Sequence, residues 1–315
     1  MFENQPSQAI AMALNIRPLT GRIGAQIDDI RLAGDIPDTV IAAIEAALSK
    51  YKVLFFRNQG HLDDAEQECF AARFGELVAH PTALAKAGSV AILELDSTGG
   101  RGRANQWHTD MTFVDAYPKI SVLRGVVIPP FGGDTVWANT VAAYEGLPPA
   151  LKMLAENLWA VHSNLYDYAA VQPQASAAAA KQYEEVFTST VYETEHPIVR
   201  VLRTGERSLV LGFFFRRFVG YPQSDSNHLF EMLQSHVTRL ENTVRWRWHA
   251  GDVAMWDNTA TQHYAINDYG DQKRVVRRAT VRGQLPVSVD GRTSVTRCKT
   301  AKPTASGPAK QPVAA

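Results

Sequence analysis

The stretch NQWHTDMTF, residues 105–113, decides the expected fold, because it sets an imidazole and a carboxylate two residues apart in a β-prone run. In a strand the side chains of residues i and i+2 share a face, so His108 and Asp110 would point the same way. Neutral imidazole and carboxylate suit a divalent metal of borderline hardness, and with one distant histidine they form the facial triad of non-haem Fe(II) oxygenases. His-x-Asp alone is a weak signal, so a third ligand must be found elsewhere.

Composition limits the classes of function. Lys+Arg and Asp+Glu both number 32 in 315 residues, which gives no net field to attract nucleic acid or an anionic membrane. A small-molecule partner is therefore expected. Cys69 and Cys298 lie far apart, which argues against a disulfide framework or a thiolate zinc site. Because neither a signal sequence nor an apolar run of membrane-spanning length is evident, we expect a cytoplasmic protein.

The hydrophobic pattern predicts a mainly β chain with flanking helices. After a flexible lead-in at residues 1–14, the pattern indicates a hairpin and two amphipathic helices, and from residue 89 onward it indicates short strands between Gly and Pro turns. Strands at this spacing are typical of a sandwich or barrel. Expected strands cover residues 51–56, 90–95, 107–113, 120–127, 135–139, 198–202, 208–214, 243–248, 252–257 and 274–282, and expected helices cover residues 35–50, 63–74, 144–158 and 224–240.

Two segments stand outside this pattern. The Ala-rich residues 171–183 predict a surface excursion or lid. Residues 291–315 contain five basic and no acidic residues with little apolar bulk, so we expect a disordered basic tail there. Residues 15–290 are then expected to form a single domain.

His263 is the best candidate for the third ligand, because it follows the expected strand at residues 252–257 through a polar turn. Arg274 and Arg278 come 11 and 15 positions later and share one face of an apolar strand. Two guanidiniums that point into the interior need anionic partners, and arginine binds carboxylate or sulfate through paired hydrogen-bond donors. An exposed edge strand with solvated arginines is the alternative. Other histidines are harder to place as ligands: His61, His162, His196, His228, His236 and His249.

The chain resembles the TauD/TfdA family of Fe(II)- and 2-oxoglutarate-dependent dioxygenases from about Leu19 to Pro286. Three blocks carry the resemblance: WHTDMTF at residues 107–113, PPFGGDTVWAN at 129–139, and WDN at 256–258 through HYA at 263–265 to the two arginines. The resemblance implies a double-stranded β-helix (jelly roll, cupin-like) and O2 as a further co-substrate. The residue roles that it implies are Fe(II) on His108, Asp110 and His263, the distal carboxylate of 2-oxoglutarate on Thr135 and Arg274, and Arg278 near both the co-substrate and the anionic head of the primary substrate.

Within the family, RIGAQID at residues 22–28 and NLWAVHSN at 157–164 look most like the alkylsulfatase branch, which hydroxylates the carbon next to the ester oxygen of alkyl sulfates. His80 sits where such enzymes keep a histidine for the sulfo group, although a structural loop histidine before Pro81 is an alternative. Met111 and Phe214 are expected at the substrate, where Phe214 either walls off the alkyl chain or packs in the core.

Three other functions stay open at this point. A taurine or other sulfonate dioxygenase would share every Fe(II) and 2-oxoglutarate residue. A biosynthetic 2-oxoglutarate-dependent hydroxylase or desaturase would release neither sulfite nor sulfate. A cupin-like binding protein without enzymatic activity would not need the pair formed by Thr135 and Arg274. We also expect a homo-oligomer, either a dimer or a tetramer.

Overall fold

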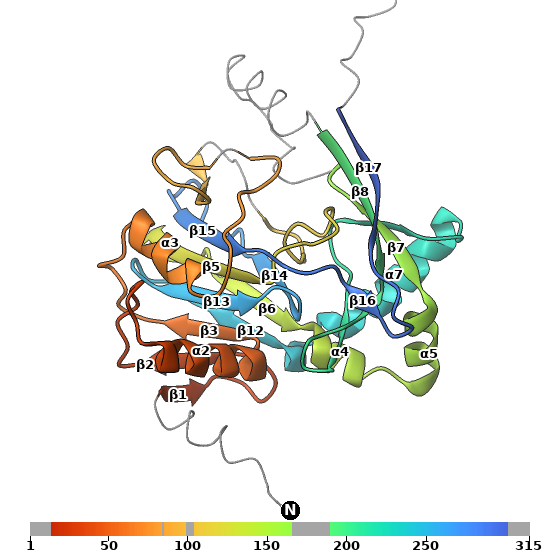
Figure 1. Cartoon of the computed structure of the whole chain (residues 1–315), viewed down its shortest axis with the longest axis horizontal. Coiled ribbons are helices and arrows are strands. Elements are labelled where there is room, and N and C mark those ends of the chain that lie inside the picture. The colour runs from red at the N-terminus through yellow and green to blue at the C-terminus, as the bar shows by residue number, and fades with distance from the viewer. Residues whose placement is uncertain (1–13, 84, 99–103, 166–189, 302–315) are drawn as a thin grey trace, which may run out of the picture.

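Strands are the most frequent regular elements of the computed structural model, which describes residues 14–83, 85–98, 104–165 and 190–301 (Figure 1). The largest sheet has seven strands, in which β2 and β3 pair in parallel and the remaining pairs are antiparallel. In spatial order these strands are β1 (Asn15–Pro18), β2 (Ala25–Asp28), β3 (Val53–Phe56), β13 (Val253–Asp257), β5 (Ile120–Val127), β15 (Val275–Val281) and β4 (Leu93–Asp96).

A three-stranded antiparallel sheet packs against one face of the large sheet. Its strands are β12 (Thr243–Trp246), β6 (Thr135–Asn139) and β14 (Thr261–Ala265). Aromatic side chains fill the space between the sheets: the ring of Phe55 stacks on Trp246 at 4.2 Å, and Trp137 meets Trp256 edge-on at 5.7 Å. Such offset and edge-to-face contacts add to the burial of these large side chains.

Two helices cover the other face of the large sheet: α2 (Asp38–Tyr51) and α3 (Asp64–Ala72). The apolar positions Ile41, Ile44 and Leu48 recur every three or four residues, as a helix needs in order to bury one side. Asp63 caps α3 in a capping box with Glu66. The prediction of helix, strand and helix is confirmed here, except that α2 runs through Tyr51 and the strand begins at residue 53.

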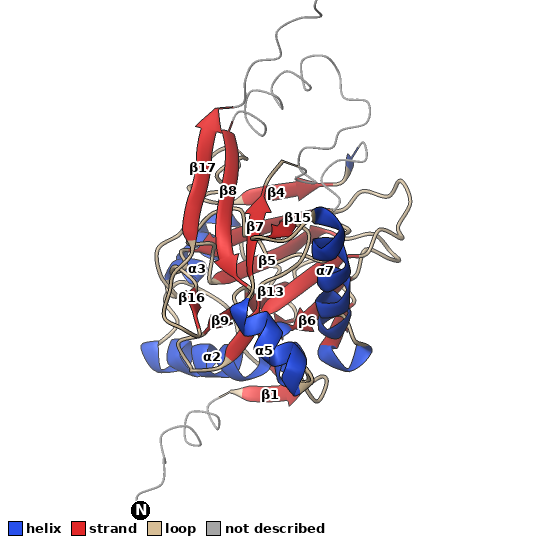
Figure 2. Cartoon of the chain, turned by 90° about the vertical axis from the view of Figure 1, so that its right-hand side faces the viewer, coloured by secondary structure: helices blue, strands red, loops and turns tan. Residues whose placement is uncertain are grey.

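The remaining elements form the other half of the molecule. Figure 2 shows β8 and β17 side by side, extending beyond the body, with α5 and α7 below and beside them. One four-stranded sheet holds β11 (Phe215–Phe218), β7 (Trp159–Ser163), β8 (Thr190–Pro197) and β17 (Val295–Ala301). A smaller sheet holds β10 (Arg207–Leu209), β9 (Val199–Val201) and β16 (Val287–Ser288). The helices of this half are α4 (Thr140–Glu145), α5 (Pro149–Asn157), α7 (Gln223–Val237) and the 3₁₀ turn η3 (Leu240–Asn242).

Three expectations need correction. The helix expected at residues 144–158 is two helices, because α4 starts earlier on an Asn139 cap and Pro148 lies between α4 and α5. The disorder expected from residue 291 is wrong for residues 291–301, where β17 pairs with β8. The strand expected at residues 107–113 is a series of turns, in which His108 alone forms a β-bridge. The Ala-rich excursion lies outside the described residues.

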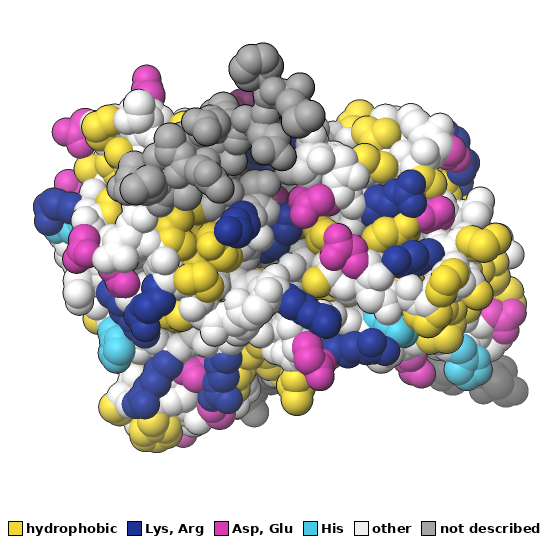
Figure 3. Space-filling view, turned by 90° about the horizontal axis from the view of Figure 1, so that it is seen from below, with side chains coloured by type: hydrophobic (Ala, Val, Ile, Leu, Met, Phe, Trp, Pro, Cys, Tyr) yellow, Lys and Arg dark blue, Asp and Glu magenta, His cyan; other side chains and the backbone are white. Residues whose placement is uncertain are grey.

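Charged side chains of both signs alternate over the surface that Figure 3 presents, in keeping with the zero formal net charge of the chain. Among the described helices, none combines the length and the apolar character that crossing a bilayer would require.

Candidate metal and co-substrate site

His108, Asp110 and His263 converge in one buried cluster whose potential ligand atoms all lie within 4.8 Å of one another. Oδ1 of Asp110 is 3.7 Å from Nε2 of His108 and 3.8 Å from Nε2 of His263. All three side chains are buried. Two imidazoles and one carboxylate are the donor set of the facial triad that leaves positions open on Fe(II).

Backbone pairing, rather than a regular strand, brings the ligands together. The N–H of His108 donates to the carbonyl of His263 at 3.0 Å, and the N–H of His263 donates back at 2.8 Å. Met111 follows with a φ of 58°, a left-handed turn that ends the extended segment directly after Asp110. The two ligands of HTD therefore converge although the strand predicted for them is absent.

Neighbouring side chains hold each ligand in a defined orientation. Nδ1 of His108 lies 2.7 Å from the carbonyl of Gln106, which fixes the proton on Nδ1 and directs Nε2 toward Asp110. Ser121 donates to Oδ2 of Asp110 at 2.9 Å, and the side chain of Asn258 accepts the N–H of Asp110 at 2.9 Å. These contacts leave Oδ1 directed at the two imidazoles.

The protonation states suit a metal. Burial lowers the pKa of His108 and lowers that of His263 well below its usual value, so both imidazoles are neutral. Burial alone would raise the pKa of Asp110, but the charge of Arg278 and the hydrogen bond from Ser121 hold it below its usual range. Neutral imidazole and ionised carboxylate are the forms that ligate metal, and the donor set therefore fits Fe(II).

A second group of side chains forms a pocket for an anion beside the triad. The Arg274 guanidinium donates through Nε to the carbonyl of Gly133 at 3.0 Å, and its Nη2 lies 3.5 Å from Oγ1 of Thr135. The indole N–H of Trp248 donates to the same hydroxyl at 3.0 Å. Arg274, Thr135, His108, His263 and Arg278 line one cavity. Burial lowers the pKa of Arg274, and an anionic ligand would counter this effect by stabilising the charged guanidinium.

Arg278 lies directly at the triad, where its Nη1 donates to Oδ1 of Asp110. His80 belongs to the same surroundings: its ring lies 6.0 Å from that of Phe113, and burial together with the charge of Arg278 lowers the pKa of His80 to about 3. The imidazole of His80 is therefore neutral near pH 7 and available as a hydrogen-bonding group next to a guanidinium.

Apolar side chains also adjoin the triad. The ring of Phe214 meets that of His108 edge-on at 6.4 Å and that of Phe113 at 5.0 Å. Phe214 and Met111 belong to one buried cluster, against which the partly buried Tyr192 and Phe213 pack. The site thus has a cationic wall and an aromatic wall.

All residues proposed from the sequence lie at or next to this site, and reasoning from the sequence missed the groups that support them. Ser121 and Asn258 orient Asp110, and Trp248 orients Thr135. Asn258 belongs to the WDN block at residues 256–258. A polar residue at the end of an apolar strand could have indicated its role at the site. Ser121 and Trp248 stand within apolar strand patterns, which carried no signal of a role at the site.

The chain is similar to known proteins over most of its length. Residues 15–280 match the family model described as "Taurine catabolism dioxygenase TauD, TfdA family". The chain is 58% identical to an alpha-ketoglutarate-dependent sulfate ester dioxygenase of Pseudomonas putida, with 92% of this chain and 96% of the relative covered. It is 57% identical to an alkylsulfatase of Acinetobacter baylyi, with 92% and 90% covered.

Solved structures show the same likeness. A taurine dioxygenase from Burkholderia xenovorans is 37% identical and superposes with a TM-score of 0.75, over 90% of this chain and 94% of that chain. AAD-2, crystallised with Mn(II) and N-oxalylglycine, is 26% identical and superposes with a TM-score of 0.70, over 87% and 98%.

Proposed function

Because the chain belongs to the TauD/TfdA family of 2-oxoglutarate-dependent dioxygenases, we propose that it oxidises alkyl sulfates at the carbon next to the ester oxygen. The products would be an aldehyde, inorganic sulfate, succinate and CO2. The observation that carries the substrate class is the 57–58% identity to a sulfate ester dioxygenase and an alkylsulfatase over nearly the whole chain.

The chain would hold Fe(II) through His108, Asp110 and His263, and the distal carboxylate of 2-oxoglutarate through Arg274 and Thr135. When bound, Fe(II) with 2-oxoglutarate and O2 supplies the oxidising chemistry that breaks the C–H bond. The protein contributes position and charge. Neutral imidazoles and the ionised Asp110 bind the metal, while the buried guanidinium of Arg274 orients the co-substrate through charge-assisted hydrogen bonds.

The sulfate head group would lie between Arg278 and His80. A guanidinium matches an oxyanion with its fork of donors, and the neutral His80 adds a hydrogen bond. The aromatic wall with Phe214 would then receive the alkyl chain and place its first carbon toward the metal.

Taurine is the second candidate substrate, because a taurine dioxygenase structure is 37% identical. Taurine carries an ammonium that would enter the site together with the sulfonate. Asp110, the carboxylate at the triad, is already paired with Arg278 and is a proposed metal ligand, so it is not free to pair with this ammonium. An ammonium without a counter-ion is costly to bury, so the site favours an apolar chain.

We further propose that residues 15–290 form one double-stranded β-helix domain. Two sheets that pack face to face across the aromatic layer, antiparallel except for the β2–β3 pair, support this assignment, since a jelly roll consists of two such sheets.

Two measurements test the function. Anaerobic titration of the protein with Fe(II) and 2-oxoglutarate should give a weak visible charge-transfer band, and its absence would reject the cofactor assignment.

Succinate formation and sulfate release should then be followed over a series of alkyl sulfates of increasing length, with taurine and a phenoxyacetate for comparison. Each methylene buried adds about 0.8 kcal/mol, so kcat/KM should rise roughly fourfold per carbon until the pocket is full. Efficient sulfite release from taurine with no response to alkyl sulfates would reject the substrate assignment and leave the metal assignment intact.

A further inference from the structure

A second cavity, of about 670 Å³, opens at the C-terminal ends of β13 and β15. It shares no lining residue with the cavity at the metal triad. Its walls come from α2, from residues 119–120 and from the β9–β10 hairpin. The candidate chemistry of the metal site does not use this cavity.

Arg200, on β9, lines the cavity and is only 6% exposed. Its strand neighbours across the sheet are Ser208 and Ser288. The Nε and Nη1 atoms of Arg200 are buried and have no hydrogen-bond partner among the described residues, and no described carboxylate forms an ion pair with this guanidinium. A buried charge without a counter-ion is strongly unfavourable, so this arginine calls for an anion.

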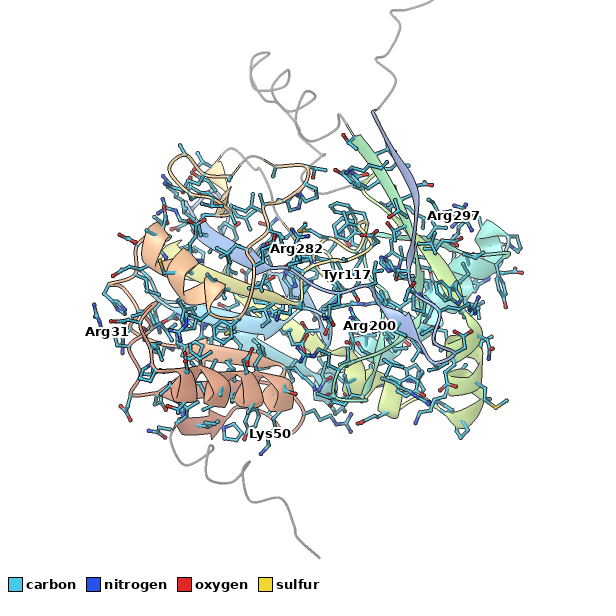
Figure 4. All side chains as sticks on the ribbon, viewed as in Figure 1. Arg31, Lys50, Tyr117, Arg200, Arg282 and Arg297 are labelled. Atoms are coloured by element: carbon cyan, nitrogen blue, oxygen red, sulfur yellow. The ribbon has the colours of Figure 1, made fainter. Side chains whose placement is uncertain are left out.

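Rigid packing keeps the Arg200 guanidinium at the cavity. The guanidinium lies 5.1 Å from the centre of the Tyr117 ring, which is itself buried. The backbone of Gly283 packs closely against the backbone of Tyr117, since a Cβ on this glycine would lie 1.8 Å from the Tyr117 carbonyl oxygen. Figure 4 shows Tyr117 and Arg200 near each other in the middle of the molecule, with Arg282 above them. The aromatic face stabilises the cation but leaves its charge uncompensated.

Further positive charge surrounds Arg200. Lys119 and Arg203 line the same cavity, and neither makes a hydrogen bond or ion pair through its side chain within the described part of the chain. Lys119 comes from the segment before β5, and Arg203 comes from the turn directly after β9, so the cations reach the cavity from two parts of the chain that are far apart in sequence. A tetrahedral oxyanion presents oxygens in several directions and fits such an arrangement better than a single planar carboxylate does.

The acidic groups of the cavity are largely engaged elsewhere. Glu76 accepts two hydrogen bonds of 2.6 Å from Arg282. Oδ1 of Asp257 accepts the N–H and the hydroxyl of Thr259 at 2.8 and 2.6 Å. Glu45 is exposed on α2. None of these carboxylates lies within ion-pair distance of Arg200, so the floor of the cavity stays cationic.

We propose that this cavity is a second anion site, which binds a small tetrahedral oxyanion, sulfate or phosphate, on Arg200 with Lys119 and Arg203 at its rim. The site is independent of the proposed enzymatic function, because it rests on residues that the metal site does not contain.

The test is calorimetric and thermal titration of the full chain with sodium sulfate and, separately, sodium phosphate, each against sodium chloride of equal ionic strength. Saturating 2-oxoglutarate and Mn(II) are present throughout to occupy the candidate metal site. We expect the wild type to bind at least one of the two oxyanions and to gain thermal stability. Arg200→Met should weaken this binding tenfold or more, whereas Arg31→Met, an exposed arginine far from the cavity in Figure 4, should leave it unchanged.

Lys119→Met and Arg203→Met each remove one rim charge without touching the buried floor, and they decide the matter if Arg200→Met fails to fold. Each should weaken oxyanion binding severalfold. The proposal is overturned if the wild type responds to sulfate and phosphate no more than to chloride, in which case another group, such as a carboxylate of a second copy of the chain, neutralises Arg200. It is also overturned if the rim variants and any folded Arg200 variant bind as the wild type does. Crystals soaked in selenate should show an anomalous peak beside Arg200, and a peak only at Arg278 would equally overturn it.

Discussion

Arg278 donates a hydrogen bond to Oδ1 of Asp110, the same oxygen that lies 3.7 and 3.8 Å from Nε2 of His108 and His263. The arginine therefore compensates the carboxylate charge at the position where a metal would also bind it. Removing one partner of a buried ion pair costs about 3 to 5 kcal/mol, because the other charge is left unpaired. The chain is thus arranged to fold without the metal, and the metal would share Asp110 with Arg278.

The first prediction concerns the ligands. His108→Ala and His263→Ala should abolish Fe(II) binding and turnover while the protein stays folded, because Asp110 keeps its partner Arg278. Asp110→Ala should abolish binding as well but should also destabilise the fold, since it leaves a buried guanidinium unpaired. Metal content after dialysis and thermal unfolding would measure the two effects. Near-native activity in any of the three variants would show that the triad assignment is wrong.

The second prediction concerns metal removal. In the presence of a chelator, Arg278→Met should lose about 3 kcal/mol relative to wild type, because Asp110 becomes an unpaired buried carboxylate. Added Mn(II) should then restore much of this loss and should raise the melting temperature of the variant more than that of the wild type. Equal metal-induced shifts in both proteins would contradict the compensating role of Arg278.

The third prediction concerns 2-oxoglutarate. Arg274→Ala removes charge-assisted hydrogen bonds worth roughly 1.5 to 3 kcal/mol, which corresponds to about a tenfold to hundredfold rise in the KM for 2-oxoglutarate. Arg274→Lys should restore only part, because the ammonium lacks the bidentate fork. Trp248→Phe should have a smaller effect of the same kind, since Trp248 only orients the Thr135 hydroxyl. Steady-state kinetics with varied 2-oxoglutarate decide this, and an unchanged KM in both Arg274 variants would place the co-substrate elsewhere.

Local patterns predicted most helices and strands, and the spacing of a few residues predicted the site. Arg274 and Arg278 could be placed together from the strand period alone, and both are buried, at 7% and 3% exposure. The conformation of the HTD segment could not be predicted, because its β-bridge to His263 spans more than 150 residues and its turn at Met111 depends on a left-handed backbone that no residue type there signals. The pairing of β17 with β8 could not be predicted either, because β17 has a basic, weakly apolar sequence and its partner strand lies about 100 residues earlier in the chain.

The fourth prediction is a loss of stability in acid. His196 is fully buried between Ser294, 2.6 Å from Nδ1, and the Thr112 carbonyl, 2.7 Å from Nε2, and burial lowers its pKa from 6.5 to about 4. As the pH falls from about 6.5 to about 4, the unfolded chain takes up this proton and the folded chain does not. The contribution of neutral His196 to the free energy of unfolding is therefore fully present above about pH 6.5, and about 3 kcal/mol of it is lost as the pH falls to about 4.

His196→Gln should remove this share of the pH dependence, as measured by urea unfolding at pH 7 and pH 4.5. The pKa of His80, lowered to about 3, acts in the same direction, so the wild type and His80→Gln should both keep the contribution of His196. An identical acid slope in wild type and His196→Gln would show that His196 does not titrate in this way.

The last prediction separates the two interpretations of Phe214. If its ring walls the alkyl chain, Phe214→Ala enlarges the space beside His108 and should shift the preferred alkyl sulfate to a longer or branched chain. If the ring only packs in the core, the variant should lose about 3 to 5 kcal/mol of stability with no change in chain-length preference. Phe218→Ala is the matched control, because Phe218 is fully buried in a different cluster, away from the metal ligands. Activity profiles over the alkyl sulfate series, measured well below the melting temperature of each variant, distinguish the two: a shifted optimum in Phe214→Ala alone assigns the wall, and an unshifted optimum assigns Phe214 to the core.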